Sequence, residues 1–275
     1  MAANVTQSVS PAPTGSAALN AVGGGGWGLG FGNLLANESR RWWGTRRWLV
    51  HLALWVVIIN GLVALVAATS GGDGMTPAEG YAELADVFTG AMAITTAIGV
   101  VAVAQGAIIG EKQMGTAAWV LSKPASRSAF VLAKLFANSG ALLVLAVLVP
   151  SAVYYAETLA FFGLAPGPAA LAAAVGLLAL HLLFYLALTL ALGTFFSGRG
   201  AVMGIGIGLI VAGMILGGAL GPLAQVLPWP LMSFARSLVL GSPLPADWLM
   251  PVAATATWIV GLTAAALWRF GREEF

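Results

Sequence analysis

The chain contains no cysteine and very little charge. Of its 275 residues, 8% are Asp, Glu, Lys or Arg, whereas 59% are hydrophobic. The absence of cysteine excludes a disulfide framework, a Cys-ligated zinc site and a thiol nucleophile. Because a soluble domain carries about 25% charged residues, most of this chain is not expected to face water.

Motifs for nucleotide hydrolysis and metal-dependent catalysis are also missing. A Walker A phosphate loop needs a lysine directly after a glycine, but Lys112, Lys123 and Lys134 follow Glu, Ser and Ala. There is no HExxH and no GxSxG, and His51 and His181 lack metal-ligand spacing. We therefore expect no catalytic residue, no metal site and no cofactor on this chain.

Long uncharged runs dominate what is present. Residues 87–110 and 135–156 contain no Asp, Glu, Lys or Arg, and runs of this length can cross a hydrocarbon core of about 30 Å as single helices. The sequence predicts an all-α polytopic membrane protein whose transmembrane domain covers residues 48–270. Its six spans are expected at about 48–69, 88–110, 128–155, 169–196, 201–227 and 248–268.

The segments around the spans have their own compositions. Residues 1–27 are rich in Ala, Ser, Pro and Gly and predict a disordered tail, and residues 271–275 form a short C-terminus. Residues 28–47 mix Trp with charge and predict an interfacial amphipathic helix; the alternative is a simple flank of the first span. Its charged residues are Glu38, Arg40, Arg41, Arg46 and Arg47. Short helices are also expected at 77–84 and 231–240.

The distribution of basic residues predicts the orientation. With a cytoplasmic N-terminus, every Lys and Arg except Arg236 falls on the inner side, as the positive-inside rule requires. We therefore expect both termini and residues 111–127 to be cytoplasmic, in a multi-pass protein of a bacterial inner (plasma) membrane.

Residues 111–127 are the most informative segment. They form a charged, proline-broken insert between two uncharged runs. Thr116 is expected to cap a short helix that contains Trp119 and Leu121 and ends before Pro124. Such an amphipathic helix suits the groove of a partner protein; the alternative is an ordinary interfacial turn.

Polar residues inside the spans are expected to be neutral, which argues against ion-coupled pumping. Most are expected to be hydrogen-bond partners between helices. The candidates for lining a transport path are Thr95, Thr96 and Gln105, which share the second span with the insert.

The fifth span is rich in glycine at GxxxG spacing. Such spacing lets another helix approach closely, either in a second protomer or within the same subunit, and both readings stay open. The glycines concerned are Gly204, Gly208, Gly213, Gly217 and Gly221.

The insert resembles the signature loop of permeases of type-2 ABC exporters. The matching residues are Glu111, Lys112, Gly115, Thr116, Leu121, Ser122, Pro124, Ser126, Arg127 and Lys134. The Asn37–Arg41 segment looks like the family's N-terminal interfacial helix. One departure is that Gln113 and Met114 replace the more acidic residues often found there.

The resemblance implies a permease subunit without an ATPase of its own. It would pair with a second permease, identical or related, and with separate cytoplasmic ATPases that bind ATP and Mg²⁺. The loop would be the coupling helix that docks on the ATPase, with Trp119, Lys123 and Arg127 among its residues. The alternatives are a stand-alone secondary transporter or channel, and a non-transporting assembly or sensor subunit.

Overall fold

The computed structural model describes residues 26, 28–70 and 75–274, so the tail expected over 1–27 lies almost wholly outside the described residues. Within these ranges the chain is helical and has no strand. The elements are α1 (Phe31–Trp43), α2 (Arg47–Ser70), α3 (Pro77–Ala104), α4 (Gly106–Gln113), α5 (Thr116–Leu121), α6 (Arg127–Leu142), the π-helical η1 (Leu143–Leu148), α7 (Val149–Phe162), α8 (Pro168–Phe195), α9 (Arg199–Leu216), the 3-10 η2 (Gly221–Val226), α10 (Pro230–Val239) and α11 (Leu249–Gly271).

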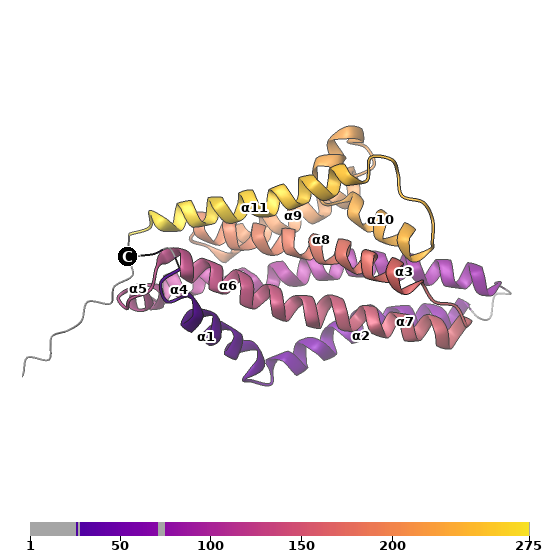
Figure 1. The fold of residues 1–275 in the computed structure, drawn as a ribbon, viewed down its shortest axis with the longest axis horizontal. Coiled ribbons are helices and arrows are strands. Elements are labelled where there is room, and N and C mark those ends of the chain that lie inside the picture. The colour runs from indigo at the N-terminus through magenta and orange to yellow at the C-terminus, as the bar shows by residue number, and fades with distance from the viewer. Residues whose placement is uncertain (1–25, 27, 71–74, 275) are drawn as a thin grey trace, which may run out of the picture.

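Six of the helical stretches are long and apolar enough to span a membrane. They run roughly along the long axis of the molecule (Figure 1). The all-α polytopic class predicted from the sequence is confirmed.

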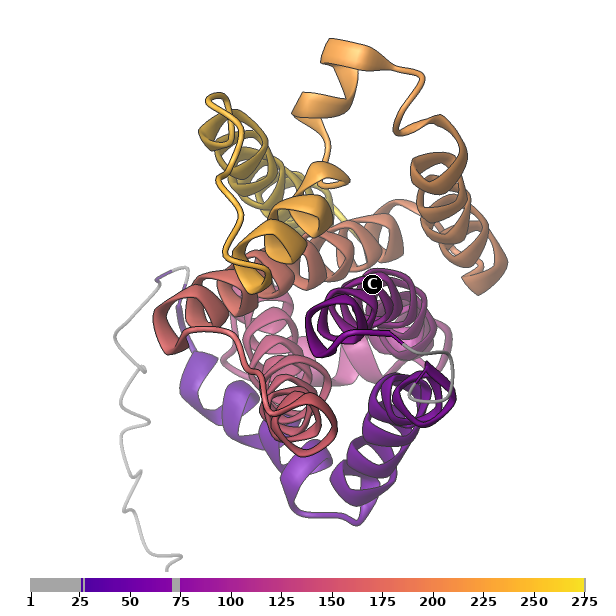
Figure 2. The ribbon, with the colours of Figure 1, turned by 90° about the vertical axis from the view of Figure 1, so that its right-hand side faces the viewer.

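Helix α8 lies at the centre of the bundle. It is apolar on all sides, which is typical of a helix that is buried all round, and its buried residues extend from Ala174 to Thr194. It packs against α11 and α10 on one side and α3 on the other, as the end-on view shows (Figure 2). By contrast, α2, α9 and α11 are less buried within this chain, so they are available to lipid or to another subunit.

The second and third spans are longer than the sequence indicated. Helices α3 and α4 continue each other from Pro77 to Gln113, over 37 residues, which is about 55 Å at 1.5 Å per residue. The separate helix expected at 77–84 is instead the first part of α3, and it starts with a capping box between Thr76 and Glu79. The third span runs from Arg127 to Phe162. Its π-helical turn directly precedes Pro150, whose ring disturbs the regular helical bonds.

The fifth span is shorter than expected. Helix α9 ends at Leu216, and the chain then passes through Gly221, at φ +50°, into η2, so the expected continuation to residue 227 is wrong. The positive φ lies at the first residue of η2, and glycine adopts it there at little steric cost. The short helix expected at 231–240 is present as α10.

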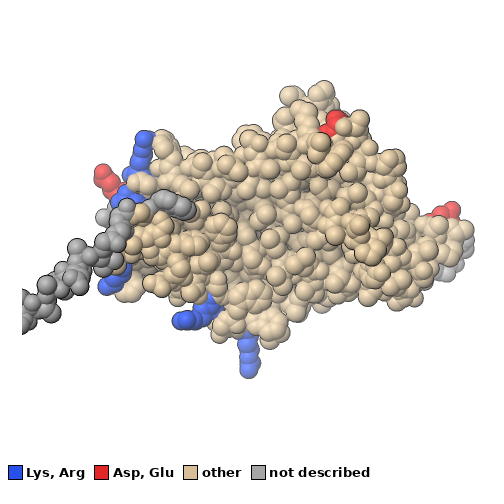
Figure 3. All heavy atoms as spheres, in the orientation of Figure 1, with Lys and Arg blue, Asp and Glu red and all other residues tan. Residues whose placement is uncertain are grey.

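One end of the molecule, which we call the basic end, holds α5 and the end of α11 (Figure 1). The Lys and Arg side chains visible in Figure 3 gather toward this end, in the left half of the view. The opposite end carries α10 and the start of α3 (Figure 1).

Candidate functional site

The insert between α4 and α6 is a compact helical hairpin. Helix α4 ends at Gln113, and Gly115 then adopts a left-handed conformation at φ +68°. Helix α5 follows, and Ser126 caps α6 by accepting a hydrogen bond from the backbone N–H of Ala129. The expected Thr116 cap is wrong: Gly115 occupies the N-cap position, and the Thr116 hydroxyl donates to the carbonyl of Glu111 at 3.2 Å.

The outer surface of the insert carries two large apolar side chains among polar ones. Met114 is 70% exposed and Trp119 is 67% exposed, whereas Ala117 of the same helix is buried. Val120 and Leu121 pack partly buried against the hydrophobic core. Lys123 lies with Nζ 5.3 Å from the centre of the Trp119 ring. The insert therefore turns one aromatic and one thioether side chain away from the protein.

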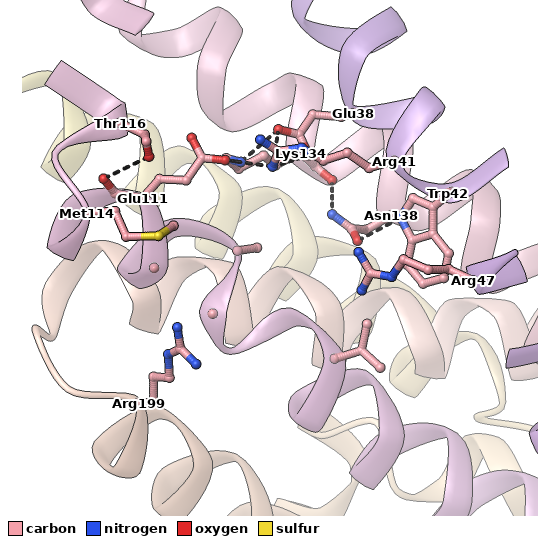
Figure 4. Close-up of a pocket in the computed structure, with 14 residues that line it drawn as sticks. Glu38, Arg41, Trp42, Arg47, Glu111, Met114, Thr116, Lys134, Asn138 and Arg199 are labelled. Atoms are coloured by element: carbon pink, nitrogen blue, oxygen red, sulfur yellow. Dashed lines mark hydrogen bonds and ion pairs between the residues drawn. The ribbon is translucent and has the colours of Figure 1, made fainter. Parts of the chain in front are cut away.

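A partly buried group of charges lies beneath the insert. Lys134 of α6 is 1% exposed, and its Nζ lies 2.6 Å from Oε1 of Glu111 and 2.8 Å from Oε1 of Glu38. Arg41 of α1 places Nη1 2.7 Å from Oε1 of Glu111 and 3.2 Å from Oε1 of Glu38. We call these four residues the four-charge cluster; they join α1, α4 and α6 (Figure 4).

The cluster is balanced, with two cations and two carboxylates. Burial alone would lower the pKa of Arg41, but the hydrogen bond to Glu111 and the charges of Glu38 and Glu111 outweigh it, and the pKa of Arg41 is raised. Arg41 is half exposed, whereas Lys134 and Glu111 are buried, and buried charges are tolerated only when they are paired and hydrogen-bonded. The cluster therefore holds α1 against α4 and α6 in one arrangement.

Further polar contacts extend from the cluster along α1. The indole N–H of Trp42 donates to Oδ1 of Asn138 at 3.2 Å, and Nδ2 of Asn138 donates to the carbonyl of Lys134 at 2.7 Å. The guanidinium of Arg47 lies 5.7 Å from the Trp42 ring centre.

The insert is also tied to the end of α8 and to the C-terminal end of α11. Nζ of Lys112 lies 2.8 Å from Oε1 of Glu273, and Nη1 of Arg127 donates to the carbonyl of Gly271 at 2.7 Å. Nε2 of Gln113 donates to the carbonyl of Ser197 at 2.9 Å, in the short connection between α8 and α9.

Its last residues contact the chain just before α1. The backbone N–H of Ser126 donates to the carbonyl of Leu29 at 2.9 Å. The insert is thus fixed to several helices of the bundle.

The structure places the other predicted residues as follows. Arg40 and Arg46 are exposed. The hydroxyls of Thr95 and Thr96 donate to the carbonyls of Ala91 and Met92 in their own helix, and Nε2 of Gln105 donates to Ala102. A role for these three in lining a path stays a prediction.

The glycines of the fifth span fall into three groups. A Cβ atom on Gly213 would lie 2.4 Å from Nε1 of Trp229, so this glycine makes room for a contact within the same chain. Gly217 follows the end of α9, and Gly221 lies beyond it, so the 217/221 pair does not form a helical face. Gly204 and Gly208 face open space.

Sequence reasoning missed the charges within the helices. Glu111 and Lys134 are buried inside the second and third spans, and Glu157 lies within the third span, where its Oε2 accepts from Nδ2 of Asn60 at 3.0 Å. The expectation that the buried polar groups are all neutral is therefore wrong. The sequence showed only that Glu111 and Lys134, which carry opposite charges, lie at the ends of two neighbouring uncharged runs.

A cavity of about 500 Å³ adjoins the four-charge cluster (Figure 4). Arg47 and Arg199 line it together with the cluster itself. Among the described residues, no group of three or more His, Asp or Glu side chains is placed to hold a metal ion.

A sequence comparison completes these observations. The family model described as ABC-2 type transporter matches residues 31–238, from the start of α1 to within α10. No curated protein matches the chain. With six membrane-spanning helices and a match over more than half its length, the chain belongs to the ABC-2 type transporter family, as a permease component.

Proposed function

We propose that this chain is the membrane permease of an ABC exporter and that the insert is the docking site for a separate ATPase. ATP and Mg²⁺ would be bound and used by that ATPase, so the permease itself needs no catalytic residue. The basic end would lie in the cytoplasm of a bacterium, with the protein in its plasma membrane, because the basic residues gather there.

The observation that carries the proposal is the exposure of two large apolar side chains on the insert. Met114 and Trp119 point away from the protein although the rest of the hairpin is anchored. Binding energy at protein interfaces is concentrated in a few large side chains, with tryptophan strongly enriched among them. This surface suits a hydrophobic groove of a partner, with Lys123 beside it at the rim.

The anchoring supports a lever mechanism. Because the insert is held to α1, α6, α8 and α11 by hydrogen bonds and ion pairs, a push on α5 cannot be absorbed by the insert alone. Helices α3 and α4 connect it continuously to the opposite end. Displacement of the insert would therefore tilt this long helix relative to α9, which contacts it.

A second permease copy would complete the transport path. Helix α9 is one of the least buried spans, and Gly204 and Gly208 present a flat, open part of its surface. Small residues of this kind let two membrane helices approach closely. We propose that this face, together with the neighbouring α3, borders the path between the two protomers.

The test begins with isolation of the partner. The chain is purified from native membranes, the copurifying P-loop ATPase is identified, and its affinity for purified permease variants is measured. Replacement of an interface tryptophan by alanine costs about 2 kcal/mol or more, so Trp119→Ala should weaken binding at least about thirtyfold. Trp43→Ala is the matched control, because Trp43 is 45% exposed but lies on α1, outside the insert.

Two outcomes would contradict the proposal. The first is equal ATPase affinity for wild type, Trp119→Ala and a Met114→Ala/Trp119→Ala double variant. The second is solute flux through the reconstituted chain without any ATPase, which would indicate a secondary transporter or channel.

A further inference from the structure

The cavity beside the four-charge cluster has a lining that the docking role does not explain. It lies between α1, the start of α2, the region where α3 passes into α4, α6 and the start of α9 (Figure 4). Its charged residues are Glu38, Arg41, Arg47, Glu111, Lys134 and Arg199.

The charges in this lining do not balance. Within the four-charge cluster, Lys134 and Arg41 each contact both carboxylates, so those charges compensate one another. Arg47 and Arg199 remain. In the part of the chain that the structure describes, neither forms an ion pair with a carboxylate. The cavity therefore carries an excess of two positive charges.

The guanidinium of Arg199 lies beside two glycines of α4. A Cβ atom on Gly110 would lie 3.2 Å from Nη2 of Arg199, and a Cβ atom on Gly106 would lie 3.5 Å from Cζ. The guanidinium thus lies against the bare backbone of α4, with room that larger residues would fill. Its planar donor groups can bind two oxygens of one anion.

Two helix N-termini add to the positive potential. Arg47 is the first residue of α2 and Arg199 is the first residue of α9. The N-terminal end of a helix carries a partial positive charge and favours anions within the first turn. Both helix ends therefore favour a bound anion, as the two guanidinium groups do.

Most of the uncharged lining is apolar, and Thr116 and Asn138 are its uncharged polar residues. Val103 and Ala107, both partly buried, contribute to the wall, and Trp42 lies beside Arg47. Tryptophan and arginine side by side are typical of the depth at which lipid headgroups lie. A ligand that joins a phosphate group to an apolar part would contact both kinds of surface.

We propose that this cavity binds a phosphate group, held between the guanidinium groups of Arg47 and Arg199. The phosphate can belong to the headgroup of an anionic membrane lipid or to a small soluble phosphate. When bound, it links the start of α2 to the start of α9. The binding does not depend on the docking of an ATPase, and the two proposals can fail separately.

The experiment measures binding to the purified full-length chain in detergent micelles without ATPase. Native mass spectrometry gives the apparent Kd for phosphatidylglycerol and, for comparison, for zwitterionic phosphatidylcholine. Thermal unfolding with and without inorganic phosphate tests the soluble source. We expect phosphatidylglycerol to bind more tightly than phosphatidylcholine. Each of Arg47→Gln and Arg199→Gln should weaken it about tenfold or more, the effect of losing a hydrogen bond to a charged group.

Arg46→Gln is the matched control, because Arg46 is exposed next to Arg47 but does not line the cavity. Arg46, Arg47 and Arg199 are all exposed, so the control differs only in its place outside the cavity. It should change the Kd by less than about twofold, as expected for an exposed charge that does not contact the ligand. Arg199→Lys, which keeps the charge but loses the planar fork, should fall between wild type and Arg199→Gln. A thermal unfolding transition measured for each variant without ligand shows that the variant is folded at the start.

The outcomes distinguish a lipid headgroup from a soluble phosphate and show whether the proposal holds. Stabilisation by inorganic phosphate as well as binding of phosphatidylglycerol supports a site for the phosphate itself, whereas binding of the lipid alone supports a headgroup site. Equal affinity for both lipids without a phosphate effect overturns the proposal. It is also overturned if Arg46→Gln weakens binding as much as Arg199→Gln, because general surface charge would then explain the result.

Discussion

Nζ of Lys134 lies 2.6 Å from Oε1 of Glu111, across the insert that separates them in the chain. Glu111 lies near the end of α4 and Lys134 lies in α6, so this ion pair closes the base of the hairpin. Both side chains are buried. Arg41 and Glu38 extend the contact to α1, so that the interfacial helix and the base of the insert form one unit.

Removing one charge of the four-charge cluster should be costly. Lys134→Met leaves Glu38 and Glu111 buried with only Arg41 as a shared partner, and breaking a buried pair in this way costs about 3–5 kcal/mol. We expect that loss in the free energy of unfolding in detergent. Lys123→Met, at an exposed position, should change it by less than about 0.5 kcal/mol.

A double variant separates loss of the pair from loss of packing. Lys134→Met/Glu111→Gln removes both members of the pair, so it should destabilise the protein less than the sum of the two single changes. Additive effects, or a loss below about 1 kcal/mol for Lys134→Met, would show that the cluster does not hold these helices together.

The left-handed backbone conformation at Gly115 should be disturbed by Gly115→Ala, which adds a single methyl group. Its φ of +68° is costly for any residue with a Cβ atom, by about 1–2 kcal/mol. Open space surrounds the position, so any effect of Gly115→Ala arises from backbone strain. We expect normal insertion into the membrane but reduced stimulation of the partner ATPase, because α5 would be misaligned. Gly32→Ala, within α1 and also in open space, is the control. Unchanged stimulation in Gly115→Ala would contradict the lever.

The two groups of glycines in α9 should respond differently to substitution. Gly213→Ala drives a Cβ atom to 2.4 Å from Nε1 of Trp229, and overpacking of this kind costs about 1–3 kcal/mol. The free energy of unfolding of the isolated protomer should fall accordingly. Gly204→Leu should leave it unchanged, because no atom lies within 4 Å of the added Cβ.

The same Gly204→Leu variant tests the proposed pairing of two permeases. A bulky side chain on a close helix contact prevents the approach, so light scattering of the purified complex should show a larger share of single protomers than for wild type. If pairing is as strong in the variant, the open glycine face is not the contact.

The ion pair between Asp86 of α3 and Arg236 of α10 should matter much less. A hydrogen bond from Arg236 to Asp86 raises the pKa of Arg236. The side chains are 43% and 51% exposed for Arg236 and Asp86, respectively. Exposed pairs contribute about 0–1 kcal/mol, and Tyr81 also joins the two helices by donating to the carbonyl of Val239 at 2.6 Å. Asp86→Asn should therefore lower the free energy of unfolding by less than about 1 kcal/mol; a loss above about 2 kcal/mol would show that the pair is effectively shielded from water.

Much of the fold could be predicted because a membrane helix is a local feature of the sequence. Uninterrupted apolar runs predicted six spans, and the expected start of the third at 128 differs by one residue from Arg127 in the structure. The end of the fifth span was misplaced because its glycines continue past Leu216 without a change in hydropathy. In the structure the helix ends at Leu216, and the chain then returns so that Trp229 packs against Gly213.

The four-charge cluster could not be predicted in the same way. Arg41 and Glu111 are separated by 70 residues, and Glu38 and Lys134 by 96. Each charge lies near an expected membrane interface, where a lone Lys or Arg is ordinary. Which of them meet depends on which faces of α1, α4 and α6 pack together, and the sequence pattern does not specify those faces.

Photo-cross-linking tests the docking role of the insert most directly. Because the chain has no cysteine, Ser122→Cys, exposed at the end of α5, can be labelled with a photoactivatable maleimide at one position. The account predicts a cross-link from this position to a P-loop ATPase in native membranes, and none from Ser242→Cys, exposed at the opposite end. A cross-link to the ATPase from position 242 but not from position 122 would contradict it.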